Sequence, residues 1–500
     1  MGMRSHNKRQ STSPLQSVIT SFGTVSMFFA VCLFIVLLAG LFLDGATPAL
    51  ILAFGLPAIA MLLLGMIIRF IFAPPQLHQK EALLLTVFSW SFLTLVGAFP
   101  IWILVDRITY LDAVFEATAG LTTTGITVLQ NLQSLPRSIL LWRSTMQFLG
   151  GLGILSFFLA VAFRRGEAPF HLFVAETSKM DAPRLTPNLY RSVNLIVFIY
   201  ITLTIVFAAL YMLSGMNAFD AVNHAMTSIS TGGFSTYDAN IAHFRHTDVN
   251  FSMLQWSMTF AMLVGGISFL IHFRILQGEL RSLWDSSEMR TFWVILLLSL
   301  ALIVLGNSLD KSTSITSYSL GISFFQTVSL LTSAGYTIEP ISSQVFPHIA
   351  KIIFLLLMLT GGMAGSTSGG VKVLRVVILF RAAKLEIRRL YTPRQTVHPL
   401  VVDQKIVPSK EFARVSALLM LWMIFSLAGT ALTLLLTEYN FLGSFSGALS
   451  TVSNMGPVYL SADEVATLPA PVKVSYILAM ISGRLEIIPI ALFVSLRSWQ

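Results

Sequence analysis

The stretch Ala119–Leu129 reads Ala-Gly-Leu-Thr-Thr-Thr-Gly-Ile-Thr-Val-Leu, and the rest of the chain repeats its pattern. It is rich in hydroxyl groups and glycine, and it follows an apolar segment of half the usual membrane-spanning length. Three echoes occur later: Ser230-Thr231-Gly232-Gly233-Phe234-Ser235, Thr332-Ser333-Ala334-Gly335-Tyr336-Thr337 and Ser453-Asn454-Met455-Gly456-Pro457-Val458. Aligned on the last glycine of each copy, the separations are 108, 102 and 121 residues, by subtraction of residue numbers. Such a long period indicates a whole supersecondary module used four times.

The composition predicts a polytopic membrane protein. Hydrophobic residues make up 55% of the 500 residues and charged residues only 11%, whereas soluble domains carry about 25% charged residues. Several apolar runs approach or exceed the roughly 20 residues that cross a bilayer. They are Phe22–Phe42, Ala82–Leu104, Leu195–Leu213, Thr291–Leu305, Ile352–Thr360 with its continuation, Ala417–Leu436 and Val474–Leu496. The first run is longer than the core of a signal peptide, so we interpret it as an uncleaved span.

The net charge of +9 fits the rule that Lys and Arg accumulate on cytoplasmic loops. Basic residues gather in the tail Met1–Ser17 and at Arg164–Arg165, Lys179–Arg191, Arg274–Arg290 and Lys372–Arg414. This bias predicts that both termini are cytoplasmic. Basic residues form no stripe interleaved with aromatic residues, so we expect no nucleic-acid binding. The single cysteine, Cys32, excludes an internal disulfide, and the sequence has no zinc-ligand spacing.

The four copies share one order of elements: a long apolar helix, a half-helix, a glycine-bearing strip and a long return helix. We therefore predict an all-α polytopic membrane protein in which two N-terminal helices, 20–43 and 48–72, precede four pseudo-symmetric repeats. The predicted division is 1–73, 74–185, 186–285, 286–395 and 396–500. Each repeat would cross the membrane an even number of times, so all four copies would have the same orientation. Transporters with inverted repeats differ, because their two halves have opposite orientations. All four strips would then lie at one face and close around one pore.

Local signals give the expected helix bounds. Asp112 and Asp220 stand ten residues before their strips, and we predict them to be the N-caps of the first two half-helices. The other half-helices are expected at Tyr318–Leu331 and Leu442–Val452. The return helices are expected at 137–163, 250–275, 348–380 and 471–497.

The strips have the chemistry of an ion filter. Backbone carbonyls from four strands can replace the hydration shell of a small cation, and glycine permits the backbone conformations that this requires. The half-helices end at the strips, so their negative dipole ends face a cation. A single Thr-x-Gly after a helix is more often a glycine C-cap, but four copies flanked by full spans favour a filter. The predicted ion-binding residues, here called strips 1 to 4, are Thr122, Thr123, Thr124 and Gly125; Ser230, Thr231, Gly232 and Gly233; Thr332, Ser333, Ala334 and Gly335; Ser453, Asn454, Met455 and Gly456.

These motifs resemble the Trk/Ktr/HKT family of potassium transporters, and the two additional N-terminal helices resemble its TrkH subgroup. The resemblance is carried by Gly-Leu-Thr-Thr-Thr-Gly (120–125), Ser-Thr-Gly-Gly-Phe-Ser (230–235), Thr-Ser-Ala-Gly-Tyr-Thr (332–337) and Asn-Met-Gly-Pro (454–457). In this family, a filter glycine in each repeat is associated with potassium passage, and serine at the first with sodium preference. All four positions are glycine here, although the methionine and proline around Gly456 imply looser selectivity.

The same resemblance implies a cellular setting. We expect potassium uptake across a bacterial cytoplasmic membrane by a lipid-embedded homodimer that binds potassium ions and no other cofactor. The family implies docking on a cytosolic nucleotide-binding ring of the TrkA kind. The chain itself has no nucleotide-binding motif. The basic segment Lys372–Lys410 is a candidate docking surface, and its charge equally suits orientation and lipid contact alone.

A glycine-rich stretch, 361–370, interrupts the third return helix in mid-membrane. Glycine costs about 1 kcal/mol relative to alanine inside a helix, so a regular helix is not expected there. A structural kink is one interpretation, and a phosphate-binding loop is disfavoured because the required lysine pattern is missing. The family resemblance implies a flexible gate under the filter, which we favour. The predicted gate residues are Gly361, Gly362, Gly365, Gly369, Gly370, Lys372 and Arg484.

Arg484 lies within an apolar run, where an arginine usually faces a cavity or a partner. It either reaches the cytoplasmic surface or, as the resemblance implies, faces the cavity near the loop and opposes cation occupancy. Lys372 either adds to that barrier or belongs to the basic cytoplasmic end.

Two other classes of function are weighed against the filter. A proton- or sodium-coupled potassium symporter would need intramembrane acids on the path. Glu116 is the one candidate, and it equally suits bonding within the collar of half-helices. An intramembrane enzyme would need a catalytic pair or metal ligands, and the sequence has no His-Glu-x-x-His. We interpret His224 as a packing residue and expect no enzyme.

Overall fold

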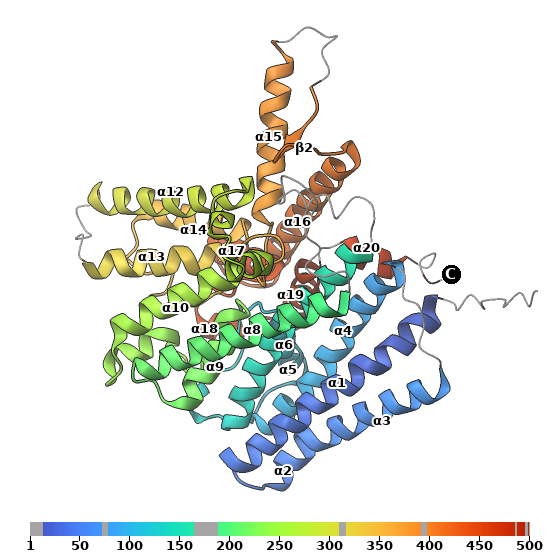
Figure 1. The fold of residues 1–500 in the computed structure, drawn as a ribbon. Coiled ribbons are helices and arrows are strands. Elements are labelled where there is room, and N and C mark those ends of the chain that lie inside the picture. The colour runs from blue at the N-terminus through green and yellow to red at the C-terminus, as the bar shows by residue number, and fades with distance from the viewer. Residues whose placement is uncertain are drawn as a thin grey trace, which may run out of the picture.

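The computed structural model describes residues 14–72, 79–164, 189–309, 317–391, 398–485, 488–495 and 499. The described part is a bundle of helices with a single two-stranded hairpin (Figure 1). The tail before Pro14, the basic residues between 165 and 188, and the predicted repeat boundaries near 73, 185 and 395 lie outside the described residues.

The N-terminal helices form a hairpin on one flank of the bundle (Figure 1). It consists of α1 (Pro14–Leu43), α2 (Pro48–Leu50), the π-helical turn η1 (Ile51–Gly55) and α3 (Leu56–Ile71). A Cβ on Gly65 would lie only 2.6 Å from the carbonyl oxygen of Gly23, and small residues permit such close helix approach in membranes. The rings of Phe29 and Phe54 pack edge-on against Trp142, with centroids at 5.5 and 5.9 Å. These contacts dock the hairpin on the first repeat.

Four groups of helices follow the hairpin, each in the predicted order. The first is α4 (Gln79–Leu104), α5 (Tyr110–Leu121) and α6 (Arg137–Arg164). The second is α8 (Leu189–Leu213), α9 (Ala218–Ile229), α10 (Phe251–Gly266) and α11 (Phe269–Leu276). The third is α12 (Ser287–Leu309), α13 (Ser317–Leu331), α14 (His348–Leu359) and α15 (Val373–Arg389). The fourth is α16 (Ser409–Leu436), α17 (Phe441–Ser453), α18 (Ala462–Ala466), α19 (Ala470–Arg484) and α20 (Ile488–Val494).

Short elements connect these helices. They are the 3₁₀ turns η2 (Leu132–Ser134), η3 (Asn240–His246) and η4 (Leu280–Leu283), and the antiparallel strands β1 (Val401–Val402) and β2 (Lys405–Ile406). Helix α15 projects from the body of the bundle, and the strand hairpin lies alongside it (Figure 1).

Six helices of the described residues are long and apolar enough to cross a membrane, and the bent pair α10–α11 is a seventh candidate. The six are the two hairpin helices and the first long helix of every group. The half-helices instead occupy the interior, where Phe115, Ala225, Phe325 and Leu449 are all 0% exposed. This arrangement agrees with the predicted multi-pass membrane protein.

The predicted N-caps of the first two half-helices are wrong by three residues. The N-cap of α5 is Thr109, whose hydroxyl accepts from the backbone N–H of Asp112 at 3.2 Å. The N-cap of α9 is Asn217, whose side-chain oxygen accepts from the N–H of Asp220 at 2.9 Å. Both acids therefore lie in the first helical turn, where a negative charge also complements the helix dipole.

Two predicted return helices are also wrong, because they are not continuous. The helix expected at 250–275 bends by 103° between α10 and α11. The helix expected at 471–497 gives α19, which ends at Arg484. The third return helix is also broken, between α14 and α15, but this break lies at the glycine-rich stretch that was expected to interrupt it. Each break exposes backbone groups that must bond elsewhere inside the protein.

Candidate functional site

Each half-helix runs directly into its strip, and the four strips share one backbone conformation. The second residue of every strip has a left-handed φ, at 53° for Thr123, 52° for Thr231, 54° for Ser333 and 51° for Asn454. The fourth residue is the aligned glycine, and its φ is 82°, 74°, 83° and 90° in strips 1 to 4. In every strip the N–H of the third residue donates to the carbonyl oxygen five residues earlier, at 2.8, 2.8, 2.8 and 3.1 Å.

Helix capping accounts for part of this conformation. A left-handed residue after a helix, followed by an N–H bonded five residues back, is the Schellman ending. Glycine usually takes the left-handed position, yet strips 1 and 2 place Thr123 and Thr231 there. A non-glycine residue in a sparsely populated conformation costs about 1–3 kcal/mol and tends to occur at functional sites. Capping does not explain the left-handed φ of the aligned glycine, which lies two residues after the capping residue.

The aligned glycines bring the strips together in a closed order. A Cβ added to any of them would lie against the carbonyl oxygen of the third residue of the next strip, and strip 4 returns to strip 1. The pairs are Gly125 with Gly232 at 2.1 Å, Gly233 with Ala334 at 2.2 Å, Gly335 with Met455 at 2.5 Å, and Gly456 with Thr124 at 2.9 Å. Four segments, each more than 100 residues from the next in the chain, thus contact one another in a closed order.

A buried ion pair supports the junction of strips 1 and 2. Glu116 of α5 and Arg143 of α6 are 0% and 1% exposed, and the Arg143 Nε donates to the Glu116 carboxylate at 2.8 Å. The same carboxylate accepts from the Thr127 hydroxyl at 2.9 Å and from the Val128 N–H at 3.0 Å. Arg143 also donates to the carbonyl oxygen of Ser235, at 3.0 Å. Glu116 is therefore fully engaged in structural bonds.

Two side-chain amides fix the strips further. Gln147, one turn beyond Arg143 on α6, donates to the carbonyl oxygen of Gly232 at 2.7 Å and accepts from the N–H of Phe234 at 3.1 Å. Asn454 of strip 4 donates to the hydroxyl of Thr124 in strip 1 at 2.9 Å. These bonds set the position of strip 2 relative to α6 and of strip 4 relative to strip 1.

His224 of α9 is buried behind strip 2. Its Nδ1 lies 2.8 Å from the carbonyl oxygen of Asp220, and its Nε2 lies 3.0 Å from the hydroxyl of Ser235. The Asp220 carboxylate accepts from the hydroxyls of Thr236 and Tyr237, at 2.7 and 2.8 Å. These contacts agree with the packing interpretation of His224.

The segment between α14 and α15, residues 360–372, folds against the ends of the half-helices, and we call it the glycine-rich loop. The Thr367 hydroxyl donates to the carbonyl oxygen of Ile229 at 2.9 Å, beside strip 2. The Gly369 N–H donates to the Ser333 hydroxyl in strip 3 at 2.6 Å. A Cβ on Gly369 would lie 2.3 Å from the carbonyl oxygen of Ser453 in strip 4. The loop thus contacts three of the four strip regions.

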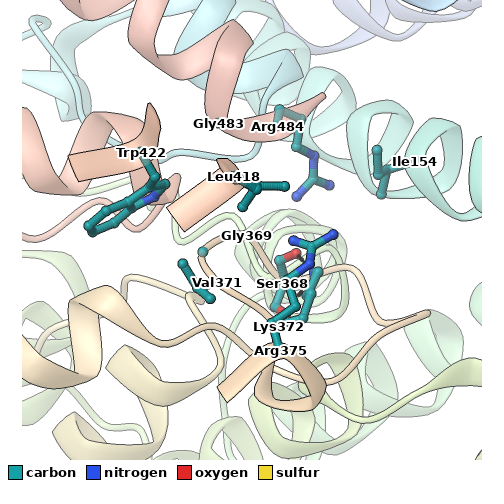
Figure 2. A pocket seen from close by; sticks show the side chains of 11 residues that line it. Ile154, Ser368, Gly369, Val371, Lys372, Arg375, Leu418, Trp422, Gly483 and Arg484 are labelled. Atoms are coloured by element: carbon teal, nitrogen blue, oxygen red, sulfur yellow. Dashed lines mark hydrogen bonds between the residues drawn. The ribbon is translucent and has the colours of Figure 1, made fainter. Parts of the chain in front are cut away.

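Two buried cations bond to carbonyl groups of this loop: Arg484, the last residue of α19, and Lys372, the last residue of the loop itself. Arg484 is 3% exposed, and its guanidinium donates to the carbonyl oxygen of Thr367 at 2.7 Å. The Lys372 ammonium, 6% exposed, donates to the carbonyl oxygen of Ser368. Figure 2 shows Arg484 on one side of a small pocket and Lys372 with Arg375 on the other. Three cationic side chains, Lys372, Arg375 and Arg484, thus line this pocket.

No local sequence motif marks Arg143 or Gln147 as part of the site. Their spacing is the one signal in the sequence, because two polar residues four positions apart lie on one face of a helix and can therefore contact the same neighbouring segment. Their partners lie 27 and 85 positions away in the chain, and local patterns do not reveal such pairings. Glu288 likewise bonds to residues 76 and 86 positions away, which no local pattern reveals.

The chain resembles known cation transport proteins in sequence and in fold. A family model described as TrkH, cation transport protein, matches residues 73–499. The chain is 30% identical over 437 residues to the Trk system potassium uptake protein TrkH of Salmonella typhimurium, covering 85% of this chain and 87% of the relative. It is 32% identical over 442 residues to an uncharacterized cation transporter of Methanocaldococcus jannaschii, covering 88% and 87%. The crystal structure of the potassium transporter TrkH from Vibrio parahaemolyticus matches with a TM-score of 0.83 at 27% identity, covering 97% of this chain and all of that one. Because the family model matches most of its length, the chain belongs to the TrkH family of cation transport proteins.

Proposed function

We propose that this protein is a channel-like potassium uptake transporter in which strips 1 to 4 form a selectivity filter around one pore. The observation that carries the proposal is the closed order of strip contacts, in which a carbonyl of each strip lies against the glycine of its neighbour. The relatives named for potassium uptake and the solved potassium transporter of the same fold support the choice of ion.

The strips supply the oxygen atoms that a dehydrated cation requires. Alternating left-handed residues turn the backbone so that carbonyls from four strands can serve one axis. Three buried strip oxygens, the hydroxyls of Thr123 and Ser453 and the amide oxygen of Asn454, have no hydrogen-bond partner within the described residues. Buried polar atoms are almost always satisfied, so these oxygens are available to a polar species beside the strips. The half-helix C-termini add negative potential there.

We favour transport driven by the membrane potential, which is worth about 2.3 kcal/mol per charge per 100 mV. A proton- or sodium-coupled symporter, the alternative, would need an acid that is free to bind the coupling ion. Glu116 instead holds an ion pair and two further hydrogen bonds. Asp220 is bonded to two hydroxyls. Neither carboxylate has the freedom that coupling requires.

The glycine-rich loop is the proposed gate. It carries the five glycines predicted for this role, and Lys372 and Arg484 hold it through its own carbonyl groups. Its displacement would free the path below the strips, because the loop contacts the regions of strips 2, 3 and 4. The two cations would oppose potassium until the loop moves.

The proposed setting follows the family. The chain would act as a homodimer in a lipid bilayer of a bacterial cytoplasmic membrane, with both termini cytoplasmic, and a cytosolic TrkA-type subunit would bring nucleotide control. The proposed division remains a two-helix hairpin at 1–73 and repeats at 74–185, 186–285, 286–395 and 396–500. The projecting helix α15 and the strand hairpin lie on the proposed cytoplasmic side and suit contact with that subunit (Figure 1).

The first test is cation flux into liposomes that contain the purified protein. With an imposed negative-inside potential, we expect potassium flux to exceed sodium flux clearly, and the flux to need no proton or sodium gradient. The cytosolic partner is added in a parallel set of liposomes. Absence of voltage-driven cation flux in every condition would reject the pore. Flux that requires a sodium or proton gradient would favour the symporter.

Replacement of Arg484 tests the gate. Arg484→Gln removes a charged donor from the carbonyl of Thr367 and a positive charge from the path, so we expect basal potassium flux to rise about tenfold, since a hydrogen bond to a charged group contributes about 1.5–3 kcal/mol. Arg414→Gln is the control, because Arg414 pairs with Glu411 at 3.0 Å on α16. Equal basal flux in the two variants would contradict the gating role.

A further inference from the structure

Glu288 ties both the glycine-rich loop and the start of α15 to helix α12. It lies in the first turn of that helix and is 0% exposed. Its Oε1 accepts from the N–H of Ala364, inside the loop, at 2.8 Å, and from the N–H of Leu374, in the first turn of α15, at 3.1 Å. One carboxylate oxygen thus bonds the loop and the helix that follows it.

These two bonds are strong for physical reasons. The Leu374 N–H is one of the first four of α15, which have no acceptor within their own helix. A carboxylate at a helix N-terminus is stabilised by the dipole, and bonds to an ionised acceptor are roughly twice as strong as neutral ones. Without the carboxylate, the buried N–H of Leu374 and the half-buried N–H of Ala364 would lose their acceptor, which is costly inside a protein.

The neighbouring residue links the same point to the strand hairpin. The N–H of Ser287 donates to both carboxylate oxygens of Asp403, at 3.0 and 3.1 Å. Arg381 of α15 donates to the carbonyl oxygen of Val401 at 2.7 Å and also to the Ser287 hydroxyl. Asp403 and Gln404 have φ of 48° and 64°, the left-handed pair of a tight two-residue hairpin turn. The hairpin is therefore a small rigid unit bonded to the start of α12.

We propose that Glu288 is a positioning residue for the gate: it holds the glycine-rich loop in its obstructing conformation, and displacement of the hairpin through Asp403 and Ser287 loosens that hold. The inference rests on the proposed gating function of the loop. Glu288 acts on the loop from α12, whereas Arg484 contacts it from α19. A partner that moves the hairpin would thereby act on the loop without touching the strips.

The test compares basal potassium flux of the full-length protein in liposomes without any partner. Glu288→Ala removes both bonds, and we expect flux to rise about tenfold, which corresponds to about 1.4 kcal/mol. Glu288→Gln keeps an acceptor oxygen and should give an intermediate rise. Asp403→Asn should raise flux less than Glu288→Ala, and should add little when combined with it. The matched control is Glu411→Gln, another buried acid in the first turn of a long helix, whose partner is Arg414.

A second readout follows the loop itself. In a Cys32→Ser background, Ala364→Cys places a thiol on the loop, and its rate of modification by a water-soluble thiol reagent reports loop exposure. We expect Glu288→Gln to raise that rate severalfold, and this measurement needs no transport. It also keeps the test decisive if Glu288→Ala does not fold.

The outcomes separate this inference from the gating proposal. Unchanged labelling and unchanged flux in the Glu288 variants, together with raised flux in Arg484→Gln, would overturn the role of Glu288 and leave the gate intact. Faster labelling without a change in flux would establish that Glu288 holds the loop and would reject the loop as the gate. A rise of equal size in Glu411→Gln would overturn the inference, since any buried acid would then have the same effect.

Discussion

Gly125→Ser should lower potassium flux by at least about tenfold and raise the sodium share of the remaining flux. The added Cβ would lie 2.1 Å from the carbonyl oxygen of Gly232, at a φ of 82°. A side chain in the left-handed region costs about 1–2 kcal/mol, and overpacking costs a further 1–3 kcal/mol. Relief of this overlap must move strip 1 or strip 2. Potassium and sodium flux into liposomes under one imposed potential measures both effects.

Gly456→Ser is the matched comparison, because the four glycines are not equally crowded. Its Cβ would lie 2.9 Å from the carbonyl oxygen of Thr124, so a small shift would accommodate it. We expect a milder loss of potassium flux and a smaller gain of sodium flux than in Gly125→Ser. The reverse order would show that these contacts do not control selectivity.

Arg143→Ala should destabilise the protein by about 3–5 kcal/mol, the cost of leaving one partner of a buried ion pair unpaired. Glu116 would lose its ion-pair partner at 0% exposure, and the carbonyl oxygen of Ser235 would lose its donor. The ring of Phe234, 4.1 Å from the guanidinium, would face a cavity. A large fall in the melting temperature of the detergent-purified protein checks this expectation.

One control variant and one rescue variant show whether the loss of stability in Arg143→Ala comes from the buried ion pair. Arg245→Ala breaks an ion pair with Glu339 of similar length, 3.0 Å, but with 27% and 21% of the side chains exposed. Exposed pairs contribute about 0–1 kcal/mol, so its melting temperature should change little. The double variant Glu116→Gln with Arg143→Met removes both charges and should recover much of the loss. A melting temperature of Arg143→Ala equal to that of Arg245→Ala would contradict the structural role of the buried pair.

The sequence predicted elements whose signals are local. The half-helices of repeats 3 and 4, expected at Tyr318–Leu331 and Leu442–Val452, agree within one residue at each end with α13 and α17. The N-caps Thr109 and Asn217 were missed because an acidic residue is common both at the N-cap and at the third helical position. Asp112 and Asp220 occupy the third position. The bend between α10 and α11 was missed because the segment stays apolar across it.

The sequence by itself determined that the chain spans a membrane and that a glycine-bearing strip recurs four times, each time after a short apolar segment. These properties depend on composition and on short-range backbone preferences, which a few consecutive residues contain. The tertiary structure decided which carbonyl lies against Gly125, that Arg143 pairs with Glu116, and that Glu288 accepts a hydrogen bond from the glycine-rich loop. Those pairings join residues far apart in the chain, and only the packing of the helices brings their atoms within bonding distance.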